Sequence, residues 1–120
     1  MVGAALVLTM TAAACAPSEQ PLLEQFFAAS RLRDKTALQA FSSVIFEPRE
    51  QGIVRTFTIT AVSPERAEAD GNHVKDVTVV APVVMPDGKA VQKTLVVTLQ
   101  RATNDRPTGY PWIIVRVAER

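Results

Sequence analysis

The chain has 120 residues, 48% of them hydrophobic, which is enough for one domain with one core and argues against wholesale disorder. Thirteen basic and twelve acidic residues nearly cancel, so the net charge is +1. A nucleic-acid-binding surface needs a basic face or stripe, and no block of like charge is present, so we expect no nucleic-acid partner.

The chain opens with a short apolar segment, residues 2–10, followed by three alanines and then by Cys15, the only cysteine. An apolar segment of this length is too short to span a membrane and suits the core of a signal peptide. The arrangement resembles the lipobox of bacterial lipoproteins, in which a cysteine thiolate receives a diacylglyceryl group before cleavage. We therefore predict a signal peptide over residues 1–14, lipidation of Cys15, and a tether over residues 15–20.

Two alternatives stay open for this segment. The three alanines also satisfy the cleavage site of ordinary signal peptidase, which would leave a secreted protein with a free terminal cysteine. The segment could also be retained as an apolar N-terminal helix. The lipobox usually has leucine where Ala12 stands, and a signal peptide usually opens with a basic residue, whereas none precedes Arg31. Translation beginning upstream of Met1 is one hypothesis for the missing basic residue.

The presence of a single cysteine is consistent with export of the protein. Cys15 has no second cysteine to form an internal disulfide, and lipidation would remove a thiol that is a liability in an oxidising compartment. We expect the protein in the cell envelope, membrane-anchored through Cys15. In the lipoproteins that the chain resembles, Asp after the cysteine is a common inner-membrane retention signal. Ala16 stands there, which favours the outer membrane or its periplasmic face.

Two helices are expected next. Apolar residues at helical spacing predict a helix over residues 19–32, with Ser18 as its N-cap. The apolar residues are Leu22, Leu23, Phe26 and Phe27. Asp34 is expected to cap a shorter second helix that runs through Leu38 and Phe41.

From Gly52 the apolar period changes from 3.6 to 2, which indicates antiparallel strands. Four strands are expected, over residues 53–62, 74–85, 90–102 and 110–117, with the clearest hairpin turn at residues 85–89. Pro82 is expected at a bulge or a sheet edge. The last strand is apolar on both faces up to Val115, so we expect it to be the more covered one.

The predicted fold class is α+β, with the N-terminal helix and the short second helix packed on a curved four-stranded antiparallel meander sheet. The expected core comprises Phe26, Phe27, Phe57, Ile59, Val79, Leu95, Val97 and one face of the last strand. A helix containing LLEQFFAA, an Asp-initiated second helix, alternating strands and a closing Trp-Ile strand resemble the cystatin-like, nuclear-transport-factor-two-like superfamily. More closely, the chain resembles small bacterial lipoproteins of that type with uncharacterised function. The predicted domain covers residues 21–120.

That superfamily includes enzymes such as ketosteroid isomerase, which needs a carboxylate base and hydrogen-bond donors that converge in an apolar cone. No motif of this kind is present, so no catalytic residue is predicted, and Asp76 is interpreted as a surface residue. His73, the only histidine, is also expected at the surface and without the partners that a metal site requires. We expect neither a metal nor a cofactor. Trp112, Tyr110 and Phe57 are the candidates for a pocket or an interface.

Threonines gather on the predicted outer face of the sheet. They are Thr56, Thr58, Thr60, Thr78, Thr94 and Thr98. Such a face is flat and only mildly polar, and related folds commonly dimerise through it. The alternatives are a homodimer through this face and an ordinary solvated sheet.

The expected function is that of a membrane-anchored envelope lipoprotein whose non-catalytic domain binds an unknown protein or small molecule, or acts as an accessory. One alternative is a small cone-pocket enzyme of the ketosteroid-isomerase type. Another is a secreted, unlipidated binding domain. The enzyme would need two or more polar groups inside the apolar cone, and the predicted core offers almost none.

Overall fold

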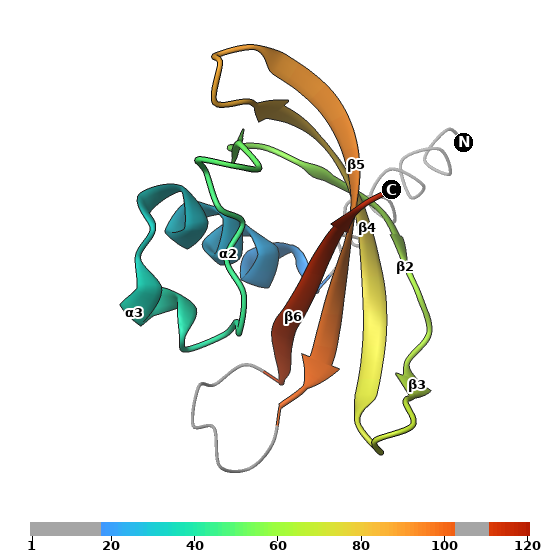
Figure 1. Ribbon diagram of the computed structural model, residues 1–120. Helices are drawn as coiled ribbons and strands as arrows, with labels where there is room; N and C mark the ends of the chain where they lie inside the picture. The colour runs from blue at the N-terminus through green and yellow to red at the C-terminus, as the bar shows by residue number, and fades with distance from the viewer. Residues whose placement is uncertain (1–17, 103–110) are drawn as a thin grey trace, which may run out of the picture.

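The computed structural model describes residues 18–102 and 111–120. Their elements are α2 (Gln20–Leu32), α3 (Lys35–Leu38), β1 (Ile53–Val54), β2 (Thr58–Val62), β3 (Arg66–Ala67), β4 (His73–Val84), β5 (Ala90–Arg101) and β6 (Trp112–Glu119). Both helices lie on one side of a curled antiparallel sheet (Figure 1). The protein is therefore a small α+β domain, as predicted. Among the described residues, no helix has the length and apolar character needed to cross a membrane.

The two helices form close to where they are predicted. The N-cap residue of α2 is Glu19 rather than the predicted Ser18, and its side chain makes no capping hydrogen bond. The physical reason is that the Glu19 carboxylate is engaged by Lys75 on the sheet. Asp34 caps α3 as predicted, since its Oδ1 accepts a hydrogen bond of 3.1 Å from the backbone N–H of Ala37. The prediction that this helix runs through Phe41 is wrong, because α3 ends at Leu38 and the chain then turns toward the edge of β6.

The sheet is built around β4, whose partner β5 pairs with it from Val74↔Gln100 to Val84↔Ala90. β5 pairs in turn with β6, and the other edge of β4 carries β1, β2 and β3. The predicted antiparallel order is thus present, but the sheet has six strands rather than the predicted four. The strand expected over residues 53–62 is split into β1 and β2, and β3, which pairs with the start of β4, lies in a segment predicted as a connection. The split lies beside Pro82, which falls between the β4 residues paired with β1 and those paired with β2. Proline has no N–H to donate to a ladder, so pairing is interrupted there.

β6 is the last strand in the sheet order, yet its first half is covered. Ile113 and Ile114 are both buried, although successive residues of a strand point to opposite faces. The chain after α3 also pairs with the free edge of β6. The backbone N–H of Ile114 donates to the carbonyl of Phe41, and that of Ser43 donates to the carbonyl of Ile114, both at 2.9 Å. The predicted covered strand is confirmed at these two isoleucines.

The core lies between α2 and the inner face of β4 and β5. The alternating residues of β4 are fully buried, as predicted; they are Val77, Val79, Ala81 and Val83. Phe27 lies at the centre of an aromatic cluster, with ring centroids 5.2 Å from Phe26, 5.6 Å from Phe46 and 5.4 Å from Phe57. Phe57 and Ile59, both predicted in the core, are half-buried at its margin. Each fully buried large side chain stabilises the fold by about 1.5–3 kcal/mol.

We predict that Gly52→Ala destabilises the domain more than Gly88→Ala. Both glycines have a positive φ, of 97° and 90°, so both variants carry backbone strain. Only at Gly52 would an added Cβ lie 2.7 Å from Val83 Cγ1 and from the carbonyl oxygen of Val84, whereas Gly88 has nothing within 4 Å. We expect the Gly52 variant to lose about 1–3 kcal/mol more than the Gly88 variant in urea unfolding. Equal losses would show that this contact does not constrain the fold.

Candidate functional site

Trp112 begins β6 at the end of the sheet near the start of α2. The alternation that buries Val77 also places Lys75 on the inner face, and Arg101 lies directly opposite Trp112 in the ladder. Lys75 Nζ is 4.3 Å and Arg101 Cζ is 4.7 Å from the centroid of the Trp112 ring. Each cation is attracted by the ring quadrupole, which stabilises such a contact by about 0.5–1 kcal/mol at exposed sites and more when water is excluded.

Lys75 also forms an ion pair with Glu19, the residue before α2. The two side chains are 14% and 9% exposed, so the pair is largely shielded from water. Burial opposes ionisation of Glu19, but the hydrogen bond and the positive charge of Lys75 outweigh it and hold the pKa of the Glu19 carboxyl below its usual value. The pair therefore fastens the start of α2 to the central strand of the sheet.

Arg101 is held from the other side by Glu65, in the segment between β2 and β3. Its Nη2 and Nε donate to the two carboxylate oxygens of Glu65 at 2.6 and 3.2 Å. The Arg101 hydrogen bond is the main reason why the pKa of Glu65 is lowered, and Glu65 in turn raises the pKa of Arg101. His73 lies beside them, with Nδ1 3.1 Å from Glu65 Oε2. The two parallel hydrogen bonds between Arg101 and Glu65 hold the guanidinium group beside Trp112.

These contacts join side chains from α2, β4, β5, β6 and the β2–β3 connection. We name them the Trp112 cluster; its members are Glu19, Glu65, His73, Lys75, Arg101 and Trp112. Two lysine or arginine cations are matched by two carboxylates within hydrogen-bond distance. With neutral histidine, the cluster therefore has no net charge, and each of these four charges has a partner.

A pocket of about 310 Å³ opens beside this cluster. It lies between the first turn of α2 and the ends of β5 and β6, and its lining comprises Ser18, Glu19, Pro21, Leu22, Leu99, Pro111 and Trp112. Most of this lining is apolar, and the one carboxylate in it is already paired with Lys75. The pocket can therefore take an apolar group, with the face or edge of an indole ring as part of its wall.

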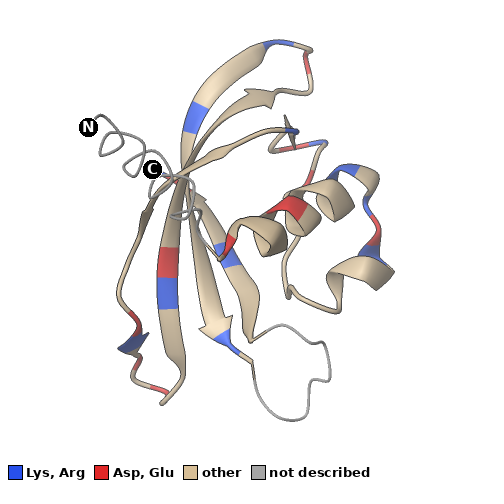
Figure 2. Ribbon diagram, turned by 180° about the vertical axis from the view of Figure 1, so that it is seen from behind, with Lys and Arg blue, Asp and Glu red and all other residues tan. Residues whose placement is uncertain are grey.

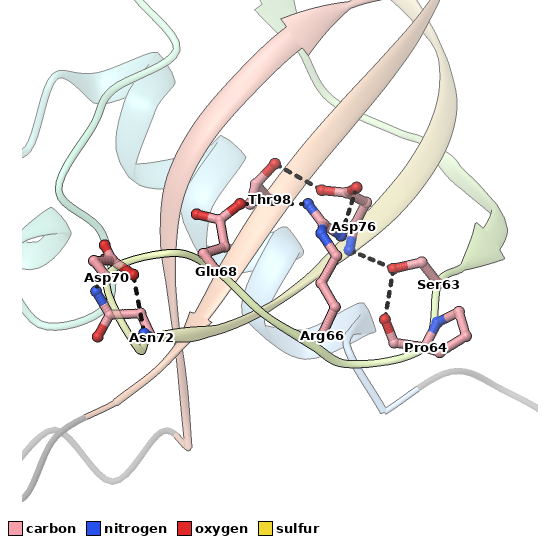
Figure 3. A network of polar contacts seen from close by, with 8 residues as sticks. All are labelled: Ser63, Pro64, Arg66, Glu68, Asp70, Asn72, Asp76 and Thr98. Atoms are coloured by element: carbon pink, nitrogen blue, oxygen red, sulfur yellow. Dashed lines mark hydrogen bonds and ion pairs between the residues drawn. The ribbon is translucent and has the colours of Figure 1, made fainter.

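The outer face of the sheet, turned away from α2, holds a second polar network (Figure 3). Asp76 accepts hydrogen bonds from Arg66 Nη1 at 3.0 Å and from Thr98 Oγ1 at 2.8 Å. Its backbone N–H donates to Ser63 Oγ at 2.8 Å. These bonds fasten three neighbours to Asp76 of β4: Ser63 of the β2–β3 segment, Arg66 of β3 and Thr98 of β5. Asp76 thus holds the sheet together on its solvent side, where the alternation places it.

The predicted threonine face is only partly open. Thr98 is 3% exposed because it lies under the Asp76 network, whereas Thr56, Thr58 and Thr60 are exposed. In Figure 2 the strands are tan over most of their length, and charged residues interrupt them at only a few places. Beyond the Asp76 network, two neighbouring rungs of the outer face carry no charge, and we name them the uncharged patch. The rungs are Thr58, Val80 and Thr94 on β2, β4 and β5, and Thr78, Val96 and Ala118 on β4, β5 and β6.

The predicted site residues do not all meet. Trp112 lines the pocket, whereas Phe57 packs against Phe27 in the aromatic cluster. Cys15 and Tyr110 lie outside the described residues. His73 is exposed and pairs with Glu65, and the described part of the chain holds no group of three His, Cys, Asp or Glu side chains placed to bind a metal ion.

Sequence reasoning missed the charged members of the cluster, although a signal for two of them exists. Extending the inner-face alternation of β4 backwards from Val77 reaches Lys75, and extending that of β5 forwards from Leu99 reaches Arg101. A cation that continues an apolar stripe must find a partner inside the fold. No local pattern shows that the partners are Glu19 and Glu65, because each lies in a different segment.

We predict that Glu19→Gln removes a pH-dependent part of the stability. Because the pKa of Glu19 is lowered in the folded state, its stabilisation is complete above the ordinary value near 4.5 and is lost as the pH falls through the lower folded-state value. The variant should be less stable than the native chain by about 1 kcal/mol or more at neutral pH, with the gap closing in acid. Urea unfolding at both pH values measures this, with Glu24→Gln, on the exposed side of α2, as the control. A gap that stays constant with pH would contradict the assignment.

Comparison with known proteins gives no further information on this site. No protein-family model, no curated protein and no solved structure matches the chain. The interpretation of the Trp112 cluster and its pocket therefore depends on the contacts described above.

Proposed function

We propose that this chain is a membrane-anchored lipoprotein of the bacterial cell envelope, and that its α+β domain is a non-catalytic binding module. The observation that carries the proposal is the position of Cys15 relative to the fold. Glu19 is buried and paired with Lys75, so the domain reaches back to within a few residues of Cys15. On the other side of Cys15 stand the alanines and the apolar segment over residues 2–10. A lipidated cysteine belongs at such a junction, because its thiol must reach the membrane while the domain stays outside.

The finer fold proposal is a cystatin-like domain. It is supported by the packing of α2 on the inner face of the curled sheet and by the helix, helix, meander order of the elements (Figure 1). The break of the first long strand into β1 and β2 beside Pro82 is a local variation that leaves this order unchanged.

Binding is assigned to the pocket beside Trp112. Of the described side chains that line it, Glu19 is the one carboxylate, and a general base needs a free carboxylate that can approach substrate. Glu19 is instead held by Lys75, where it supports the fold. For this reason we do not propose the cone-pocket enzyme. The secreted, unlipidated domain stays the alternative, and it differs from the proposal only in the fate of Cys15.

We predict that Cys15→Ser moves the protein out of the membrane fraction. The native chain, produced in a bacterial host, should sediment with membranes and float with them in a density gradient, because several acyl chains give stable anchoring. The Cys15→Ser chain should lose this behaviour. Glu24→Gln is the control, since it changes an exposed residue of α2 outside the pocket and keeps the thiol. Equal membrane association of the native chain and the Cys15→Ser chain would rule out Cys15 as the anchor.

The homodimer through the outer sheet face stays a prediction, and the uncharged patch, whose two rungs together cover β2, β4, β5 and β6, gives it a defined surface. Light scattering of the Cys15→Ser protein at high micromolar concentration should give the mass of a dimer. Val80→Lys places a charge inside the uncharged patch, so it should return the protein to a monomer, whereas Val91→Lys, near the tip of the β4–β5 hairpin, should not. A monomeric starting protein under these conditions is the result that refutes the dimer.

A further inference from the structure

The pocket beside Trp112 lies at the start of the folded domain. Ser18 and Glu19 are both part of its wall, and Glu19 is fixed to the sheet by Lys75. Three Cα–Cα steps separate Cys15 from Ser18, and each step spans about 3.8 Å, so the two residues lie at most about 11 Å apart. A lipid on Cys15 would therefore hold this end of the domain directly at the membrane surface.

The chemistry of the pocket suits hydrocarbon better than a charged headgroup. Its apolar wall is formed by Pro21, Leu22, Leu99, Pro111 and Trp112. The two nearby cations are already satisfied, Lys75 by Glu19 and Arg101 by Glu65. An anionic ligand would have to compete with both carboxylates, whereas an apolar chain would only displace water from apolar walls. Tryptophan, like tyrosine, is also enriched where proteins meet the membrane–water interface.

We propose that the Trp112 pocket is the surface through which the anchored domain sits against the bilayer, and that it takes the apolar chain of a membrane lipid. The proposal rests on the proposed function, because the short tether brings the pocket to the membrane only if Cys15 carries the anchor. Beyond the proposed function, it specifies how the domain is oriented on the bilayer and which class of ligand the Trp112 pocket binds. The hairpin between β4 and β5, at the opposite end of the sheet, points away from the bilayer.

Trp112 is the only tryptophan of the chain, so its fluorescence reports on this pocket alone. The test uses the full protein extracted with its lipid and reconstituted into phosphatidylcholine vesicles whose acyl chains carry bromine, a short-range quencher. Trp112 emission should fall strongly relative to unbrominated vesicles of the same composition. Flotation of the same vesicles is measured in parallel and reports on anchoring.

A matched reporter tests the orientation. Trp112→Phe combined with Val91→Trp moves the only indole to the far end of β5, about ten residues and ~33 Å away along the strand. Val91 is 43% exposed, so a larger side chain fits there without entering the core. The reporter at position 91 should show little quenching. Protein that floats with the vesicles while Trp112 is not quenched, or while both reporters are quenched equally, overturns the inference and leaves the proposed function standing. Protein that does not float overturns the proposed function and the inference with it.

A second experiment tests whether the pocket takes an apolar chain or an anionic headgroup. Adding phosphatidylglycerol to the brominated vesicles should leave the quenching of Trp112 unchanged, since the cations of the cluster are already paired. Quenching that appears only with the anionic lipid would assign the pocket to a headgroup and overturn the assignment to an apolar chain.

Discussion

The ion pair between Glu19 and Lys75 joins the residue before α2 to the central strand of the sheet, and the functional geometry depends on it. It places the first turn of α2 against β5 and β6, which forms one wall of the pocket beside Trp112. It also sets the point at which the domain begins, a few residues after Cys15. Either partner left alone in that largely buried position would be costly, so the pair favours the packing in which Glu19 and Lys75 meet. The helix direction and the position of the pocket are thus coupled to one contact.

The sheet explains why cations lie there at all. β4 and β5 carry an apolar inner face over most of their length, and that face ends at Lys75 and Arg101, beside Glu19 and Glu65. Trp112 fills the space between the two cations, and Glu65 holds Arg101 from the β2–β3 segment. Paired charges therefore line one side of an apolar pocket. Such a pocket is suited to an apolar ligand that is bound next to water.

Much of this fold follows from the sequence. The apolar spacing of α2, the cap at Asp34 and the alternation of β4 each depend on near neighbours, so they were predictable. The broken first strand was not, because Pro82 exerts its effect across the sheet, on residues some 25 positions earlier in the chain. The displaced N-cap and the paired charges of the site have the same cause: Glu19 and Lys75 meet only through tertiary packing. Trp112 could be singled out as a rare aromatic residue, but its neighbours could not.

In the proposed function, the chain reaches the membrane through Cys15 and the short tether brings the domain to the membrane surface. Intact mass spectrometry of the protein extracted from membranes tests it most directly. We expect the mass of residues 15–120 plus acyl groups, with the acyl mass absent from the Cys15→Ser protein. A mass that matches the unmodified chain, or residues 15–120 without acyl groups, would contradict it and leave Cys15 as a free thiol.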